Sequence, residues 1–268
     1  MKKPVKLRLR QILHFLMVLC LIGILCSAFI IFTDNLDNIK GVTAYRQLSI
    51  LMDSSKLTQG QKKTVTQIMD ETKEQEHISE VDFTSLEKIN PDIVGWIGAK
   101  DTEINYPVVK GKDNDHYLNY MFNGERNKLG SIFMDYRNSS NFSDKNTIIY
   151  GHNMKDGSMF SPLTNYKNQQ YYNSFPTLLL YTPEGDFTIE LFAGIIVDGD
   201  YESIRLTFKD DLDFQSYVDL LKEKSTFESD VTVKSGDQII TLSTCSYEFD
   251  NARYALYGRL VLLDNGKG

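Results

Sequence analysis

The chain opens with a long apolar segment. Residues Ile12 to Phe32 are apolar except for His14, Gly23 and Ser27. At about 1.5 Å per residue, a helix over this segment would be roughly 32 Å long, which matches the hydrocarbon core of a bilayer. The pattern therefore predicts a transmembrane helix at 12–32.

The residues before this segment predict its orientation. They include five basic and no acidic side chains, namely Lys2, Lys3, Lys6, Arg8 and Arg10. By the positive-inside rule, residues 1–11 form a cytoplasmic tail and the chain after residue 32 is exported. The alternative is a cleaved signal peptide, whose apolar region is typically about 7–15 residues long. This segment is longer and Cys26-Ser27-Ala28 is a poor cleavage site, so the pattern favours an uncleaved single-pass anchor.

Helical patterns follow the anchor. Val42 to Leu57 and Gln61 to Glu76 predict two short helices, within a helical stalk at 33–80. Thr84-Ser85-Leu86-Glu87 fits a capping box, which predicts a short helix that Pro91 ends.

From residue 81 onward, the pattern is mainly that of β-strands. Short β-branched or aromatic runs are bounded by Gly, Asn, Asp and Pro, which is typical of strands separated by turns. These runs predict eight strands, at Ile93 to Ile97, Ile104 to Val109, Ser131 to Met134, Thr147 to Tyr150, Thr177 to Tyr181, Phe187 to Val197, Gln238 to Cys245 and Arg253 to Leu263. We therefore expect a mainly β catalytic or binding domain at 81–268, with accessory helices.

One helix interrupts the strands. Four apolar residues lie at i, i+3, i+4 and i+7 after the acidic residues Asp211 and Asp213, and they are Phe214, Tyr217, Val218 and Leu221. This spacing places them on one face of a helix, and the acidic start is typical of a helix N-terminus. The segment is predicted to pack against the core.

Composition narrows the possible functions. The chain has 268 residues, of which 41% are hydrophobic, enough to bury a core and to exclude a disordered tail. Five of its 29 basic residues precede the anchor, so the exported part carries 24 basic against 36 acidic side chains, a formal charge of −12. This charge argues against a nucleic-acid partner. There is no glycine-rich phosphate loop and no metal-ligand spacing among the four histidines, so we expect no cofactor and no metal.

Cysteine usage singles out Cys245. Cys20 and Cys26 lie in the apolar segment, so Cys245 is the only cysteine after residue 32 and has no partner there for an internal disulfide. A lone thiol in an oxidising compartment is either a small buried side chain or a residue with a chemical task.

An arginine is predicted beside this thiol. If the last two strands pair in antiparallel fashion, Arg253 lies directly opposite Cys245, with Cβ atoms about 4.5–5.5 Å apart. Arg259 then faces Ile239, roughly 20 Å from the thiol at about 3.3 Å per residue. A guanidinium beside a thiol favours the thiolate and donates hydrogen bonds to the oxygen of an attacked carbonyl. The alternative for Arg253 is a solvated surface residue.

A cysteine nucleophile also needs an imidazole that transfers protons. His14 lies in the apolar segment, His77 in the stalk and His116 in an Asp-rich turn. His152 follows the apolar strand at 147–150 and a glycine, at a strand end where functional side chains are often displayed. His152 is therefore the candidate imidazole, and its alternative is an ordinary loop residue.

These residues resemble a known family. Thr241-Leu242-Ser243-Thr244-Cys245 followed by Arg253, with Tyr150-Gly151-His152-Asn153-Met154 upstream, resembles the sortases, membrane-anchored cysteine transpeptidases of Gram-positive bacteria. Asn105 to Val109, Gly130 to Asp135, the TLSTC form of the cysteine motif, the N-terminal helices and the helix at 213–224 resemble class B. The resemblance covers roughly Asp82 to Leu263.

The resemblance implies a fold and a reaction. The fold is a closed eight-stranded sortase β-barrel with N-terminal helices and a helix inserted before the nucleophile strand. The reaction is cleavage of a C-terminal sorting signal, of the NPxTx type in class B, after Thr through a thioester. The acyl group then passes to an amine of a peptidoglycan stem peptide, cross-bridge or lipid-linked precursor, which anchors the secreted protein to the cell wall.

The resemblance also implies residue roles. Cys245 is the nucleophile, His152 the general acid/base and Arg253 the oxyanion and substrate-positioning residue. Four positions match sorting-signal contacts, and they are Asn114, Leu118, Ile204 and Ser243. Two departures concern the loop after the cysteine. Ser246 stands where some class B members carry an acid, and the spacing of eight residues from Cys245 to Arg253 is shorter than in others.

Two rival functions remain at this point. The first is a hydrolytic cysteine peptidase of the cell surface, although papain-like enzymes place Cys before His and carry a C-G-S-C-W type signature that is absent here. The second is a non-catalytic surface binding domain that keeps one buried cysteine.

Overall fold

The structure is a computed structural model that describes residues 5–66, 81–199 and 204–263. Its strands close into a barrel in the order β1-β2-β3-β4-β7-β8-β6-β5. Within the described residues there are eight strands, at β1 Ile93–Gly98, β2 Asn105–Lys110, β3 Ile132–Met134, β4 Asn146–Tyr150, β5 Thr177–Tyr181, β6 Asp186–Asp198, β7 Ile239–Cys245 and β8 Ala252–Leu262. The predicted closed eight-stranded barrel is confirmed, and each predicted strand end lies within one residue of the observed one.

The sheet is mixed. β2 pairs with β3 and β4 pairs with β7 in parallel, whereas the other neighbouring strands are antiparallel. β6 and β8 form the longest ladder, from Phe187 opposite Leu262 to Asp198 opposite Ala252. Parallel neighbours need long crossover connections, and these carry the short helices and loops around the barrel.

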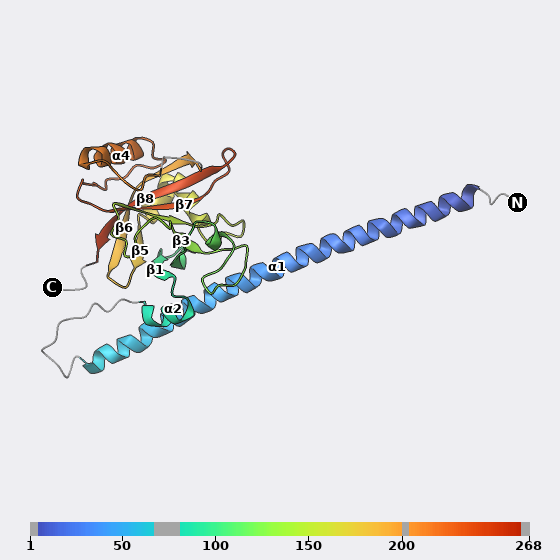
Figure 1. Cartoon of the computed structure of the whole chain (residues 1–268), viewed down its shortest axis with the longest axis horizontal. Coiled ribbons are helices and arrows are strands. Elements are labelled where there is room, and N and C mark those ends of the chain that lie inside the picture. Colours follow the sequence, from blue (N-terminus) through green and yellow to red (C-terminus); the bar gives the residue numbers. More distant parts are fainter. Residues whose placement is uncertain (1–4, 67–80, 200–203, 264–268) are drawn as a thin grey trace.

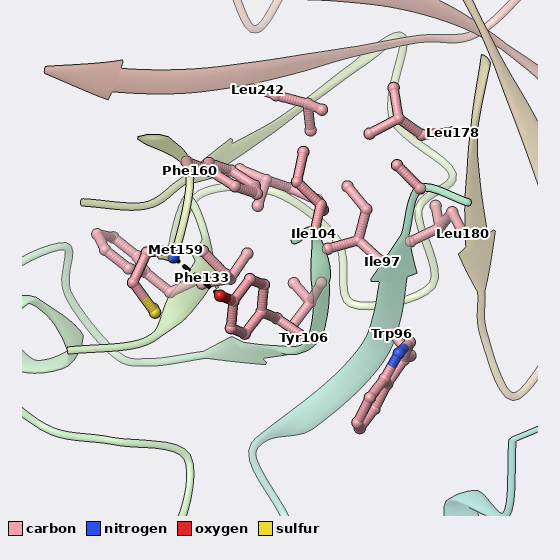
Figure 2. Close-up of a cluster of buried hydrophobic side chains, with 14 of the residues drawn as sticks. Trp96, Ile97, Ile104, Tyr106, Phe133, Met159, Phe160, Leu178, Leu180 and Leu242 are labelled. Atoms are coloured by element: carbon pink, nitrogen blue, oxygen red, sulfur yellow. Dashed lines mark hydrogen bonds between the residues drawn. The ribbon is translucent and has the colours of Figure 1, made fainter. Parts of the chain in front are cut away.

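The barrel encloses an apolar core (Figure 2). Ile97 from β1, Leu180 from β5 and Leu242 from β7 converge there, and none of the three is exposed to solvent. Tyr106 at the edge of this cluster accepts a hydrogen bond from the backbone N–H of Met159 at 2.9 Å, so its hydroxyl does not remain unsatisfied.

A second apolar cluster lies outside the barrel, beneath helix α4 (Asp211–Glu223). Asp210 caps this helix by accepting a hydrogen bond from the Asp213 N–H at 2.9 Å. The predicted core-facing stripe is confirmed, because its members are all buried, namely Phe214, Tyr217, Val218 and Leu221. In Figure 1, α4 lies across the side of the barrel formed by β6 and β8.

The N-terminal region differs from the prediction. α1 runs without a break over Val5–Thr66. The prediction of two separate helices, at 42–57 and 61–76, is therefore wrong for the part up to Thr66. Residues 67–76 lie outside the described residues. The only glycine between the expected helices is Gly60, and a single glycine costs a helix about 1 kcal/mol without ending it. The apolar segment of α1 is long and apolar enough, by length and composition, to cross a membrane.

α1 also contacts the barrel (Figure 1). Tyr45 and Leu48 on this helix are buried, and the Tyr45 hydroxyl donates to the carbonyl of Gly130 at 2.7 Å. The Asn127 amide donates to the Asp37 carbonyl at 2.7 Å. The barrel therefore packs on α1 a few residues after the apolar segment ends.

The remaining helices are short. α2 spans Phe83–Ile89, and the expected capping box at 84–87 is wrong, because Asp82 is the N-cap and accepts from the Ser85 N–H at 3.1 Å. Because Asp82 accepts a hydrogen bond from a backbone N–H group of the first helical turn, the helix begins before Thr84. The others are η1 His116–Leu118, η2 Ser161–Lys167 and α3 Gln169–Ser174.

Candidate active site

Strands β7 and β8 bring the candidate nucleophile and arginine together. Their antiparallel register places Cys245 directly opposite Arg253, as predicted, and Arg253 Nη1 lies 3.5 Å from Cys245 Sγ. The same register places Arg259 opposite Ile239, where its guanidinium pairs with Glu190. Of these two arginines, Arg253 is the one beside the thiol.

The parallel pairing of β4 with β7 brings in His152. Tyr150 lies opposite Ser243, and two residues farther along each strand are His152 and Cys245. The backbones stay joined past the end of β4, because the Gly151 N–H donates to the Ser243 carbonyl at 3.1 Å and the Thr244 hydroxyl donates to the Gly151 carbonyl at 2.8 Å. The imidazole and the thiol are therefore displayed at the same end of adjacent strands.

The orientation of the imidazole is set by a backbone carbonyl. His152 Nε2 lies 2.7 Å from the carbonyl oxygen of Leu118. Since a carbonyl oxygen can only accept, Nε2 carries a proton in this arrangement. Nδ1 has no hydrogen-bond partner among the described residues, so it is the nitrogen free to exchange a proton with a reacting group.

All seven residues predicted for the site from the sequence line one cavity of about 680 Å³. They are Asn114, Leu118, His152, Ile204, Ser243, Cys245 and Arg253. The cavity also includes residues to which the sequence analysis gave no role, among them Phe133, Arg137, Tyr150 and Asp198. Its volume lies within the range of about 300–1,000 Å³ that is typical of ligand-binding clefts.

Ser243 offers a free polar group in this cavity. Its side chain is buried, and its hydroxyl has no hydrogen-bond partner within the described part of the chain. A buried hydroxyl without a partner is costly, and a ligand in the cavity that bonds to it would remove this cost.

Asp135 is a buried carboxylate that the sequence analysis placed only within a family motif. It accepts hydrogen bonds from Arg137, Asn114 and Tyr150, three residues that line the cavity. Burial on its own would raise the pKa of the Asp135 carboxyl, but the bonds from Arg137 and Asn114 outweigh burial and lower it. A carboxylate directly after a buried strand is the sequence signal that could have identified it.

The loop after Cys245 is held by an ion pair. Lys167 from η2 bonds to the Glu248 carboxylate, and Lys167 also donates to the Ser246 hydroxyl at 2.8 Å. The Lys167 ammonium and the Ser246 hydroxyl lower the pKa of Glu248 to about 2. The carboxylate near the cysteine is therefore that of Glu248, and it accepts a hydrogen bond from the Ser246 hydroxyl.

Gly199, just after β6, makes room for the arginine. A Cβ atom at Gly199 would lie 2.7 Å from Arg253 Nε and 2.9 Å from the carbonyl oxygen of Asn251. Both distances are shorter than van der Waals contact, so any larger residue would displace the guanidinium or the loop. The position of Arg253 therefore depends on a glycine from a strand distant in sequence.

Comparison with known proteins places this site in a family. No protein-family model matches the chain. Over 182 residues, however, it is 42% identical to Sortase B of Listeria monocytogenes, covering 67% of this chain and 74% of that protein. It is also 40% identical over 192 residues to Sortase B of Staphylococcus aureus, covering 71% and 78% respectively. The chain belongs to the class B sortases.

Solved sortase B structures support this assignment. A Staphylococcus aureus sortase B–substrate complex matches with a TM-score of 0.72 and 34% identity, covering 85% of this chain and 100% of that one. A sortase B complexed with triglycine matches with a TM-score of 0.64 and 39% identity, covering 68% and 86%. As a class B sortase, the chain is a cysteine transpeptidase, which confirms the predicted enzyme class and excludes the alternative of a non-catalytic binding domain.

Proposed function

We propose that this sortase cleaves an NPxTx-like C-terminal sorting signal of secreted proteins after Thr and transfers the new acyl group to a peptidoglycan amine. The observation that carries the proposal is the cavity that contains Cys245, His152 and Arg253, with the thiol 3.5 Å from the guanidinium. The substrate complex and the triglycine complex of other class B sortases support a peptide substrate and an amine acceptor.

The first half of the reaction forms a thioester. The Cys245 sulfur, as thiolate, attacks the carbonyl carbon of Thr, and the carbonyl oxygen becomes an oxyanion that accepts hydrogen bonds from Arg253. As the intermediate collapses, the C–N bond breaks and His152 donates a proton to the leaving amine. The products are a thioester on Cys245 and the released C-terminal fragment.

The second half resolves the thioester. An uncharged amine of the wall precursor attacks the thioester carbonyl, and His152 accepts the proton that the amine loses. The C–S bond then breaks, which regenerates the Cys245 thiolate and leaves an amide between the secreted protein and peptidoglycan. The imidazole acts as an acid when the thioester forms and as a base when the amine resolves it, so one residue serves both steps.

The rest of the cavity is proposed to hold the sorting signal. Leu118 and Ile204 supply apolar contacts, whereas Asn114 and the unpartnered hydroxyl of Ser243 supply hydrogen bonds. The Leu118 carbonyl also holds His152 at 2.7 Å, so peptide binding beside Leu118 takes place next to the acid/base.

The location follows from the apolar helix. We propose a cytoplasmic tail at 1–11, a single-pass anchor at 12–32, a stalk at 33–80, of which 67–80 lie outside the described residues, and an extracellular catalytic domain at 81–268. The five basic residues before the anchor support this orientation. Because the barrel packs on α1 near Asp37, it would lie close to the membrane surface, where secreted sorting signals and lipid-linked wall precursors are found.

Mass spectrometry of the full chain with a panel of sorting-signal peptides tests the proposal. A covalent acyl adduct on Cys245 is expected, and Cys245→Ala should abolish both adduct and cleavage while the protein stays folded. Adding triglycine should convert the product from free acid to amide. Cleavage that survives Cys245→Ala would refute the thiol mechanism, and free acid as the only product would favour a hydrolytic peptidase.

A further inference from the structure

Asp135 connects three residues of the cavity wall that come from different parts of the chain. Its side chain has no solvent exposure and lies just after β3. Oδ2 accepts from Asn114 Nδ2 at 3.1 Å, from Arg137 Nη2 at 2.7 Å and from the Tyr150 hydroxyl at 3.0 Å. Oδ1 accepts from the Arg137 backbone N–H at 3.0 Å and from its Nε at 2.8 Å. One carboxylate thus satisfies five donors.

These bonds give the Asn114 amide a single orientation. While Nδ2 donates to Asp135, Oδ1 accepts from the Tyr136 backbone N–H at 3.1 Å. A flipped amide would place its oxygen against the carboxylate and its NH₂ group against the N–H, so both contacts would become repulsive. The observed orientation leaves one N–H of Asn114 Nδ2 available to a ligand.

The same carboxylate sets what Arg137 and Tyr150 present. Arg137 binds Asp135 through Nε and Nη2, which leaves its Nη1 group for other partners. Tyr150 gives its hydroxyl proton to Asp135, so only its oxygen lone pairs remain free. Together with Asn114, the wall presents N–H donors and one oxygen acceptor, which match the C=O and N–H groups of a peptide backbone.

Among the described residues, Asp135 makes no hydrogen bond to Cys245, His152 or Arg253, although its partners line the same cavity. A change at Asp135 should therefore weaken peptide binding equally in the ground state and the transition state, which raises KM and leaves kcat unchanged.

We propose that Asp135 is a positioning residue for sorting-signal recognition, which holds Asn114, Arg137 and Tyr150 in the orientation that binds the peptide backbone. The proposal rests on the proposed function, because that function makes this cavity the peptide site. Asp135 itself does not touch the substrate in this account.

The test is Asp135→Asn in the full chain, assayed for cleavage of a sorting-signal peptide. An amide keeps the shape but places its NH₂ group against at least two of the five donors. We expect KM to rise about tenfold, which corresponds to about 1.4 kcal/mol of lost binding free energy, and kcat to stay within twofold.

The matched control is Asp144→Asn. Asp144 accepts hydrogen bonds from Asn138 and Ser139 in the same β3–β4 connection, but it does not line the cavity. Its KM should not change.

A double-mutant cycle separates positioning from a general structural effect. Because Asp135 acts partly through Asn114, Asp135→Asn should raise KM by a smaller factor in an Asn114→Ala background than in the wild-type background. The same fold-change in both backgrounds, or a wild-type KM for Asp135→Asn, would overturn the proposal.

A second variant covers the case in which Asp135→Asn does not fold, as judged by its melting temperature. Asn114→Asp alters only a half-buried loop side chain, yet it places a carboxylate against that of Asp135. Repulsion should displace the side chain and raise KM above that of Asn114→Ala, whereas equal KM values would contradict the proposal.

A spectroscopic measurement distinguishes this proposal from the proposed function. In the full chain in detergent micelles, the Asn114 side-chain NH₂ resonances should shift in Asp135→Asn and stay in place in Asp144→Asn. Unchanged Asn114 resonances would overturn the positioning role even if peptides are cleaved. Shifted resonances in a chain that cleaves no sorting-signal peptide would instead count against the proposed function.

Discussion

Replacing Arg253 by alanine tests the assignment of the oxyanion residue. Arg253 Nη1 lies 3.5 Å from the Cys245 sulfur, so it is close to the carbonyl oxygen of any peptide bond that this sulfur attacks. The substitution removes a charged donor from the cavity without removing apolar packing from the barrel core. Arg259→Ala on the same strand is the matched control.

The expected loss follows from the geometry. Removing one oxyanion donor usually lowers the rate by about 10²–10³, equivalent to roughly 2.7–4 kcal/mol. Arg259 lies opposite Ile239, six residues along β7 from Cys245, or roughly 20 Å at about 3.3 Å per residue. It pairs with Glu190 and is partly exposed, so its removal should cost little stability and should change kcat/KM less than threefold.

The assay is cleavage of a fluorogenic sorting-signal peptide by the full chain in detergent, with kcat/KM measured for wild type, Arg253→Ala and Arg259→Ala. Melting temperatures of the three proteins exclude unfolding as the cause of any loss. Equal losses in the two variants, or activity within threefold of wild type for Arg253→Ala, would refute the assignment. A loss confined to KM would show that Arg253 only binds the substrate.

Three further predictions concern other parts of the molecule. Gly199→Ala should lower kcat/KM at least tenfold while keeping the fold, because its Cβ would lie 2.7 Å from Arg253 Nε; wild-type kinetics would contradict this close approach. Glu248 has a folded-state pKa of about 2, below its ordinary 4.5, so its pairing with Lys167 stabilises the fold above about pH 4.5, and this contribution is lost as pH falls towards 2. Melting temperatures of wild type and Glu248→Gln should therefore converge over that range, and a constant difference would argue against the ion pair. Deleting residues 1–32 should preserve peptide cleavage in vitro but prevent wall attachment in cells, and normal attachment by the truncated chain would show that the anchor is dispensable.

The loop after the cysteine is held by contacts with a distant part of the chain. Ser246 has no carboxylate of its own, but its hydroxyl contacts Glu248 and Lys167. Since Lys167 belongs to η2, far along the chain, this connection ties the end of β7 to another part of the barrel surface. Ser246 is therefore held by neighbours that only the fold brings together.

Local pattern was sufficient to predict the strands, α4 and the pairing of Cys245 with Arg253. These features depend on residues close in sequence: alternating and apolar runs define strands, the i, i+3, i+4, i+7 stripe defines α4, and a short connection between β7 and β8 leaves antiparallel pairing as the simple outcome. The membrane-length apolar run likewise depends on composition alone. Local pattern was insufficient at helix ends, where Asp82 rather than Thr84 caps α2 and where α1 continues past Gly60.

The tertiary structure alone decided how the site is assembled. His152 lies at the same end of the sheet as Cys245 because β4 and β7 pair in parallel. The next residue, Asn153, is 92 positions before Cys245 in the chain, yet its side chain donates a hydrogen bond to the Cys245 carbonyl at 2.8 Å. Parallel pairing needs a crossover, and nothing in the pattern of either strand specifies which distant strand will be its neighbour. The same holds for two partners of Asp135, since Asn114 lies 21 residues before it and Tyr150 lies 15 residues after it. Sequence predicts which side chains can carry the chemistry, whereas closure of the barrel decides which of them share one cavity, because burial and hydrogen bonding are satisfied over the whole fold at once.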